Sequence, residues 1–231
     1  MKKFLSVSLI LGLFAAIVAI GGTSGTNAQS AGLMSSILNR MERQKQSLKT
    51  LSADISMWKY NSQLRDEEKY SGVLKYVPAA NAFVYLEWNK PQHEILVTAN
   101  GDYWLYRPRL GIVYVGKTNS IKNRNDSDIL ALLSMSAAQL RTKFGEAQEI
   151  RDETLYGGVG TTHFKVSPKG PASYRHIELW VDKEGMPVQT KMVEKNDDST
   201  TVRLTNVEKN QTIPHDIFTL KLNPSVKRVK G

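Results

Sequence analysis

Residues 83–107, FVYLEWNKPQHEILVTANGDYWLYR, decide the fold class of this chain. Three segments in it, Phe83–Trp88, His93–Ala99 and Asp102–Arg107, alternate their side chains with the two-residue period of a β-strand. Asn100-Gly101 separates the last two segments, and both residues tolerate the positive φ angles of a tight hairpin turn. The stretch therefore predicts antiparallel strands joined by short turns.

The same two-residue period continues on both sides of this stretch. The further strand-like segments are 53–60, 69–77, 111–116, 148–155, 161–167, 174–181, 187–194, 200–208 and 216–222. About a dozen strands at a spacing of 8–13 residues predict a large antiparallel meander, and so many strands in one sheet must curl.

Helical signals are few. An amphipathic pattern over 31–51 carries apolar residues at helical spacing, Ser127 or Asp128 caps a short apolar run over 129–135, and Ser136 with Gln139 forms a capping box for a helix ending near Phe144. Two or three helices are too few to cover both faces of the sheet, but enough to cover its concave face. The expected fold is α+β: an incomplete, half-open antiparallel β-barrel of about 11 strands with a lid of two or three helices.

The N-terminal segment is typical of an export signal. Lys2 and Lys3 precede the apolar run Phe4–Ile20, and Thr26-Asn27-Ala28 is a small-x-small cleavage site. A transmembrane anchor is the alternative, but this run of 17 residues falls short of the roughly 20 that span a bilayer. We predict that residues 1–28 are cleaved and that 29–231 form one domain, soluble in the periplasm. The chain has no cysteine, which excludes disulfides and a lipid-modified N-terminus.

The charge balance narrows the class of partner. The formal net charge is +9, and the mature chain stays basic because residues 1–28 carry only two lysines and no acids. A basic exported protein can meet anionic lipid headgroups or an acidic protein, although a merely solvated basic surface is equally compatible with the sequence. Nucleic acid is not expected, because the cations are scattered along the chain.

Catalytic and metal-binding patterns are missing from the sequence. Gly157-Gly158-Val159-Gly160 does not match a phosphate-binding loop, and the pairs Glu67-Glu68 and Asp197-Asp198 lie in turns. The histidines have no metal-ligand spacing; they are His93, His163, His176 and His215. The sequence therefore predicts neither an enzyme nor a cofactor or metal site.

Apolar side chains at strand and helix spacing are the candidate binding residues. Lining the concave face and the underside of the lid, they would form a cavity suited to an acyl chain, which gains about 0.8 kcal/mol per buried CH₂. Ordinary core packing is the alternative for each of them. The candidates are Val84, Leu86, Trp88, Leu96, Trp104 and Tyr106 from the strands, Leu33, Ile37 and Met41 from the first helix, and Leu132 and Met135 from the lid.

The order of several short motifs resembles the LolA family of periplasmic lipoprotein carriers. Residues 72–78 (GVLKYVP), the strand before Pro91, 94–97 (EILV) and 104–108 (WLYRP) match the first part of the family pattern. The strand 164–169 (FKVSPK) with the turn 182–185 (DKEG), and the segment 218–224 (FTLKLNP) with its later valines, match the rest.

The resemblance implies a half-open barrel with a helical lid and an acyl-binding cavity without enzymatic activity. It also implies a monomer that takes acylated lipoproteins from an inner-membrane ABC exporter and passes them to an outer-membrane acceptor. Two alternatives with the same fold stay open: an envelope sensor or adaptor, and a carrier of free lipid or glycolipid. The best-known members have an arginine before the proline of the first motif, where this chain has Val77. Closure of the lid is then expected to differ from that of those members or to rest on packing.

Overall fold

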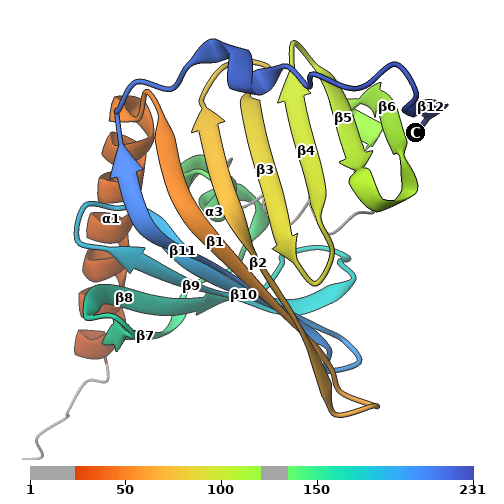
Figure 1. The fold of residues 1–231 in the computed structure, drawn as a ribbon. Helices are drawn as coiled ribbons and strands as arrows, with labels where there is room; N and C mark the ends of the chain where they lie inside the picture. Colours follow the sequence, from red (N-terminus) through yellow and green to blue (C-terminus); the bar gives the residue numbers. More distant parts are fainter. Residues whose placement is uncertain (1–23, 121–134) are drawn as a thin grey trace, which may run out of the picture.

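One 12-stranded sheet dominates the computed structural model, which describes residues 24–120 and 135–231, with side chains from residue 31 onward (Figure 1). The strands are β1 (Leu51–Asn61), β2 (Asp66–Val77), β3 (Phe83–Lys90), β4 (Glu94–Ala99), β5 (Asp102–Arg107), β6 (Ile112–Lys117), β7 (Gln148–Leu155), β8 (Val159–Val166), β9 (Tyr174–Asp182), β10 (Pro187–Glu194), β11 (Ser199–Lys209) and β12 (Lys227–Lys230). The α-helices in the described ranges are α1 (Ser24–Ser47) and α3 (Ala137–Lys143), and the 3₁₀ helices are η1 (Pro108–Leu110), η2 (Thr118–Ser120) and η3 (His215–Phe218).

The strand order is β12-β6-β5-β4-β3-β2-β1-β11-β10-β9-β8-β7. All neighbours are antiparallel except β12, which runs parallel to β6. Two meanders, β1–β6 and β7–β11, are joined where β1 pairs with β11. The described strands form a curled sheet that does not close, as Figure 1 shows. This is the α+β, half-open arrangement that the sequence predicts.

One face of the sheet carries a continuous apolar row, and we call it the inner face. Directly paired residues share a face, and the register places Ala53 opposite Leu74, Leu74 opposite Leu86, Leu86 opposite Leu96 and Leu96 opposite Leu105. All five are buried in the main core cluster. The row crosses five strands, so the inner face of the first meander is apolar from β1 to β5.

Helix α1 covers the inner face of the second meander. Met57 on β1 pairs with Val202, Val202 with Thr190, and Thr190 with Leu179, so Leu179 lies on the inner face. Ile37, Leu38 and Met41 of α1 pack with Leu179 and with α3 in a second buried cluster. Figure 1 shows α1 alongside β8–β10 and α3 behind the sheet.

Several local predictions are confirmed. Asn100 and Gly101 have φ angles of 53° and 84°, as a tight hairpin turn requires. The Ser136 hydroxyl accepts a hydrogen bond from Gln139 N at 3.1 Å, and Gln139 Oε1 accepts one from Ser136 N at 3.0 Å, which is the predicted capping box. The predicted helix over 31–51 instead runs from Ser24 to Ser47. The helix expected over 129–135 lies outside the described residues, apart from Met135.

The strand expected over 216–222 is wrong. This segment forms η3 and irregular chain on the outer face of the sheet, where Phe218 is buried and its ring lies 5.6 Å from that of Phe83. Its alternating pattern reflects packing of single apolar side chains on a sheet face rather than strand pairing. The sequence analysis also missed β12, because four mostly polar residues give no strand signal and their partner β6 is more than 100 residues away.

Candidate functional site

Four of the strand residues proposed for binding lie together on the inner face. Val84, Leu86, Trp88 and Leu96 are all buried members of the main core cluster. The ring of Trp88 meets that of Tyr70 edge-on, with centroids 5.6 Å apart. The structure thus brings these four side chains together in one apolar surface on the inner face of the sheet.

Trp104 and Tyr106 do not belong to that surface, and their assignment to it is wrong. The two-residue turn places Ala99 opposite Asp102, so an even-numbered residue of β4 faces an odd-numbered residue of β5. Trp104 therefore pairs with Val97 and Tyr106 with Ile95, on the outer face of the sheet. Leu105 takes the inner position opposite Leu96. The alternation of side chains along a strand makes the two faces mutually exclusive.

The residues proposed from the helices are placed unevenly. Ile37 and Met41 are buried between α1 and the sheet. Met135 is half-buried against the same cluster. Leu33, one turn before Ile37, is 45% exposed and outside both core clusters. Leu132 lies outside the described residues.

A small apolar cavity separates the second half of α1 from the sheet. Its volume is about 90 Å³, and it is lined by Met41, Gln44, Lys45, Leu48, Tyr76, Pro78, Met135, Gly185, Met186 and Pro187. Three of these residues are methionines, whose unbranched side chains repack easily around a variable guest. Burial raises the pKa of the Tyr76 phenol above its ordinary value.

Sequence reasoning found Met41 and Met135 but missed the other side of this cavity. Met186 and Pro187 follow the 182–185 turn, which in sequence is only a polar connection between β9 and β10. Leu48 lies two turns after Met41 on the same side of the helical pattern, and that spacing was a usable signal. No signal in the sequence brings the 182–185 turn to α1.

That turn holds α1 in place by close backbone contact. Gly185 has φ 98°, and a Cβ built on it would lie 2.3 Å from the carbonyl carbon of Arg40. Asp182 Oδ1 accepts hydrogen bonds from the backbone N–H of Glu184 at 2.9 Å and of Met186 at 2.8 Å, which fixes the turn. Lys209 on β11 bonds to Glu184, and this contact holds the pKa of Glu184 below its ordinary value.

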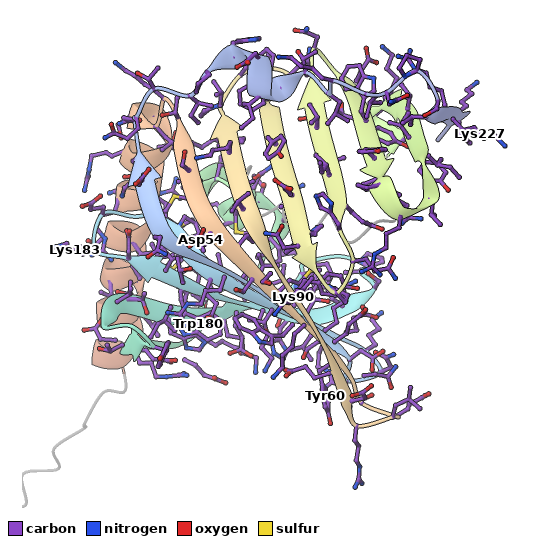
Figure 2. The ribbon with its side chains drawn as sticks, viewed as in Figure 1. Asp54, Tyr60, Lys90, Trp180, Lys183 and Lys227 are labelled. Atoms are coloured by element: carbon purple, nitrogen blue, oxygen red, sulfur yellow. The ribbon has the colours of Figure 1, made fainter. Side chains whose placement is uncertain are left out.

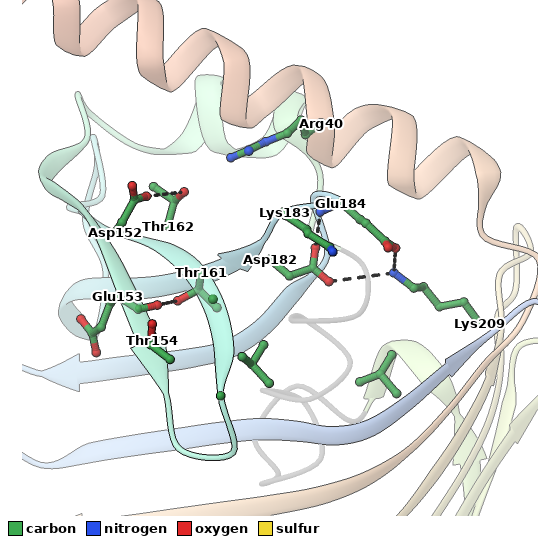
Figure 3. Close-up of a pocket in the computed structure, with 14 residues that line it drawn as sticks. Arg40, Asp152, Glu153, Thr154, Thr161, Thr162, Asp182, Lys183, Glu184 and Lys209 are labelled. Atoms are coloured by element: carbon green, nitrogen blue, oxygen red, sulfur yellow. Dashed lines mark hydrogen bonds and ion pairs between the residues drawn. The ribbon is translucent and has the colours of Figure 1, made fainter.

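A second, polar pocket of about 700 Å³ lies on the other side of the same turn (Figure 3). Arg40 of α1 projects toward the β7–β8 hairpin, where Asp152 and Thr162 lie, and the Lys209 contacts close the opposite side. The lining mixes lysine, arginine, carboxylates and threonines. Among the described residues, no three His, Asp or Glu side chains gather in a way that could hold a metal ion.

Comparison with known families decides what kind of fold this is. A model of the family described as outer membrane lipoprotein carrier protein LolA matches residues 46–221. The chain belongs to the LolA family. The LolA match covers β1 to β11, including the inner face and the 182–185 turn. No curated protein matches this LolA-family chain.

Solved structures share the fold at low sequence identity. MucB is 12% identical with a TM-score of 0.56, over 82% of this LolA-family chain and 63% of MucB, and MucB is also known in complex with MucA(peri). An uncharacterised conserved protein from Thermus thermophilus is 11% identical with a TM-score of 0.55, covering 85% and 98% of the two chains. LprF from Mycobacterium bovis is 14% identical with a TM-score of 0.51, covering 80% and 97%.

Within the described ranges, no helix of this LolA-family chain combines the length and apolar character needed to cross a bilayer.

Proposed function

We propose that this protein is a periplasmic carrier that holds the acyl chains of lipoproteins non-covalently and moves them from the inner to the outer membrane. The observation that carries the proposal is the continuous apolar inner face, from Ala53 to Leu105, beside a cavity walled by Met41, Met135 and Met186. Membership of the LolA family supports the same function.

The energetics fit a carrier that uses no energy source of its own. Each buried CH₂ contributes about 0.8 kcal/mol, so even part of an acyl chain is held firmly. Release then requires an acceptor that binds the chain more tightly. We therefore expect an ABC exporter in the inner membrane as donor and an outer-membrane acceptor, with binding rather than catalysis as the activity.

Loading requires the cavity to grow. Ligand pockets usually measure about 300–1,000 Å³, and the cavity under α1 measures about 90 Å³. The wall that would have to move is α1, which meets the 182–185 turn at Gly185 and packs on the second meander through Ile37, Leu38 and Met41. Movement of α1 away from Met186 and Tyr76 would open the cavity onto the apolar inner face.

A release assay tests the proposal. Mature protein is added to spheroplasts that accumulate a newly made lipoprotein, and the supernatant is analysed for a one-to-one complex. Leu48→Trp fills the cavity from a half-buried position and should abolish release, whereas Leu64→Trp, the same change at an exposed site, should not. Absence of any complex with folded wild-type protein would refute the carrier function.

An adaptor that binds an envelope protein is the second candidate. The small volume of the cavity and the fold shared with MucB, which is known in complex with MucA(peri), favour it. An adaptor would bind its partner whether or not that partner is acylated. Capture of an unacylated cargo as strongly as the acylated one, or extraction of free lipid alone, would therefore exclude the lipoprotein carrier.

A further inference from the structure

The turn between β5 and β6 presents an exposed leucine at its tip. Leu110 ends the 3₁₀ helix η1, and 60% of its surface is accessible. Gly111 follows with φ 60° and returns the chain into β6. Arg109, the residue before the leucine, is also exposed. An apolar side chain beside a cation at the end of a turn is a composition suited to the boundary between lipid headgroups and acyl chains.

Strand β12 places three further cations along the same edge of the sheet, with Lys227 beside the tip and Arg228 and Lys230 further along β6. The backbone N–H of Lys227 donates to the Gly111 carbonyl at 2.8 Å, and β12 then pairs with β6 from Ile112 onward. Lys227, Arg228 and Lys230 are all exposed, and Figure 2 shows Lys227 at the outer edge of the sheet. Within the described ranges, these three cations and Arg109 form no ion pair, so their charge is available to a partner.

Three of the nearby acids are already engaged by other cations. Glu94 binds Arg107 at 2.8 Å, and Asp102 binds Lys117 at 2.5 Å. Asp216 lies 4.0 Å from Lys221. Glu68, which lines the groove beside the tip, accepts a hydrogen bond from the Tyr70 hydroxyl at 2.6 Å. The four cations of the tip and β12 therefore outnumber the acids beside them.

A groove leads from this tip to the apolar inner face. Its volume is about 410 Å³, and its lining includes Arg109, Leu110, Tyr70 and Trp88. Trp88 is a buried member of the main core cluster. The groove therefore connects the exposed leucine with the surface that we propose to bind acyl chains.

We propose that the η1 turn and β12 form a docking surface for anionic phospholipid membranes, and we call it the basic tip (Arg109, Leu110, Lys227, Arg228 and Lys230). Leu110 enters the headgroup boundary while the four cations bind lipid phosphates. Docking in this orientation turns the mouth of the groove toward the lipid. The docking does not depend on carrier activity; only the benefit of the orientation rests on the proposed function.

The surface fits a membrane better than an acidic protein. Its cations are long side chains on a turn and an edge strand, and they lie in a row beside a single apolar side chain rather than around a patch with a defined shape. A fluid anionic membrane surface adapts to such an arrangement. Each lysine or arginine close to the anionic lipids strengthens binding by roughly fivefold.

Vesicle sedimentation of the mature protein, without cargo, tests the docking. We expect binding to vesicles of about 70% phosphatidylcholine and about 30% phosphatidylglycerol, and none to pure phosphatidylcholine. Arg109→Ala and Lys227→Ala should each weaken binding by about fivefold. Leu110→Glu should abolish it, and its exposed position makes retention of the fold, checked by circular dichroism, the expected result.

Leu64→Glu is the matched control. Leu64 is 76% exposed at the tip of the β1–β2 hairpin, where Arg65 is outnumbered by the acids Asp66, Glu67 and Glu68. Its substitution should leave vesicle binding unchanged. Equal loss in both leucine variants, equal binding to both vesicle types, or no binding to either would overturn the proposal.

The two proposals fail in distinguishable ways. The cavity-filling variant Leu48→Trp should lose lipoprotein release but still bind anionic vesicles. Release without vesicle binding would refute only the docking surface. Vesicle binding without release would refute only the carrier.

Discussion

Gly185 lies directly against the backbone of Arg40, and this contact sets the distance between α1 and the sheet. A Cβ at position 185 would fall 2.3 Å from the Arg40 carbonyl carbon and 2.4 Å from its oxygen. The apolar cavity under α1 begins at this contact, since Gly185 and Met41 both line it.

Gly185→Ala should therefore loosen α1. Two costs add: strain at φ 98°, of about 1 kcal/mol, and displacement of the helix backbone, of about 1–3 kcal/mol. The loss of unfolding free energy measured by urea denaturation gives the sum of these two costs. Gly157→Ala is the control, because Gly157 has φ 87° but a Cβ added there would meet nothing within 4 Å. Equal destabilisation in both variants would contradict a role for the helix contact.

Trp88 and Trp104 should behave differently, because Trp88 is buried on the inner face and Trp104 is half-buried on the outer face. Trp88→Ala removes a buried side chain on the inner face and should lower the unfolding free energy by about 3–5 kcal/mol. The same variant should also lose the release of cargo from spheroplasts. Trp104→Ala alters the outer face and should cost less and leave release intact. If a folded Trp104→Ala variant lost cargo release, the cargo would bind the outer face, which contradicts the proposed site on the inner face.

The capping box should stabilise α3 measurably. Ser136→Ala removes the acceptor of the Gln139 N–H and should lower the unfolding free energy by about 1 kcal/mol. Thr142→Ala serves as the control, since the Thr142 hydroxyl is exposed and bonds only to carbonyls of its own helix. A thermal unfolding series on both variants separates the cap from a general effect of removing a hydroxyl.

Stability should fall when the solution becomes mildly acidic. Burial, followed by the charge of Lys165, lowers the pKa of His176 below its ordinary value, against the opposing effect of Glu178. The unfolded chain then binds the proton more readily than the folded one, so this contribution to stability is complete above about pH 6.5 and decreases as the pH falls below it.

The slope of unfolding free energy against pH, between about pH 7 and about pH 5, measures this effect. His176→Gln removes the titrating group and should flatten that slope, whatever it does to the absolute stability. A slope unchanged by the substitution would assign the acid sensitivity to other groups.

Most of the fold follows from local patterns in the sequence. The two-residue period predicts the strands β1 to β11. Turn residues predict the Asn100-Gly101 turn, and capping residues predict the Ser136 cap. The hairpin turn even contained the information that Trp104 and Tyr106 face outward, because a two-residue turn fixes the register. The sequence therefore carries the signal that places both side chains.

Tertiary structure alone decided the rest. The sequence by itself determined the strands, their turns and the amphipathic first helix, because these depend on neighbours within a few residues. Four contacts join residues more than 100 positions apart. They are the contact of α1 with Gly185, the approach of Met186 to Met41 across the cavity, the packing of η3 on the outer face and the pairing of β12 with β6. Such contacts depend on how the sheet curls, and no local pattern encodes that curvature.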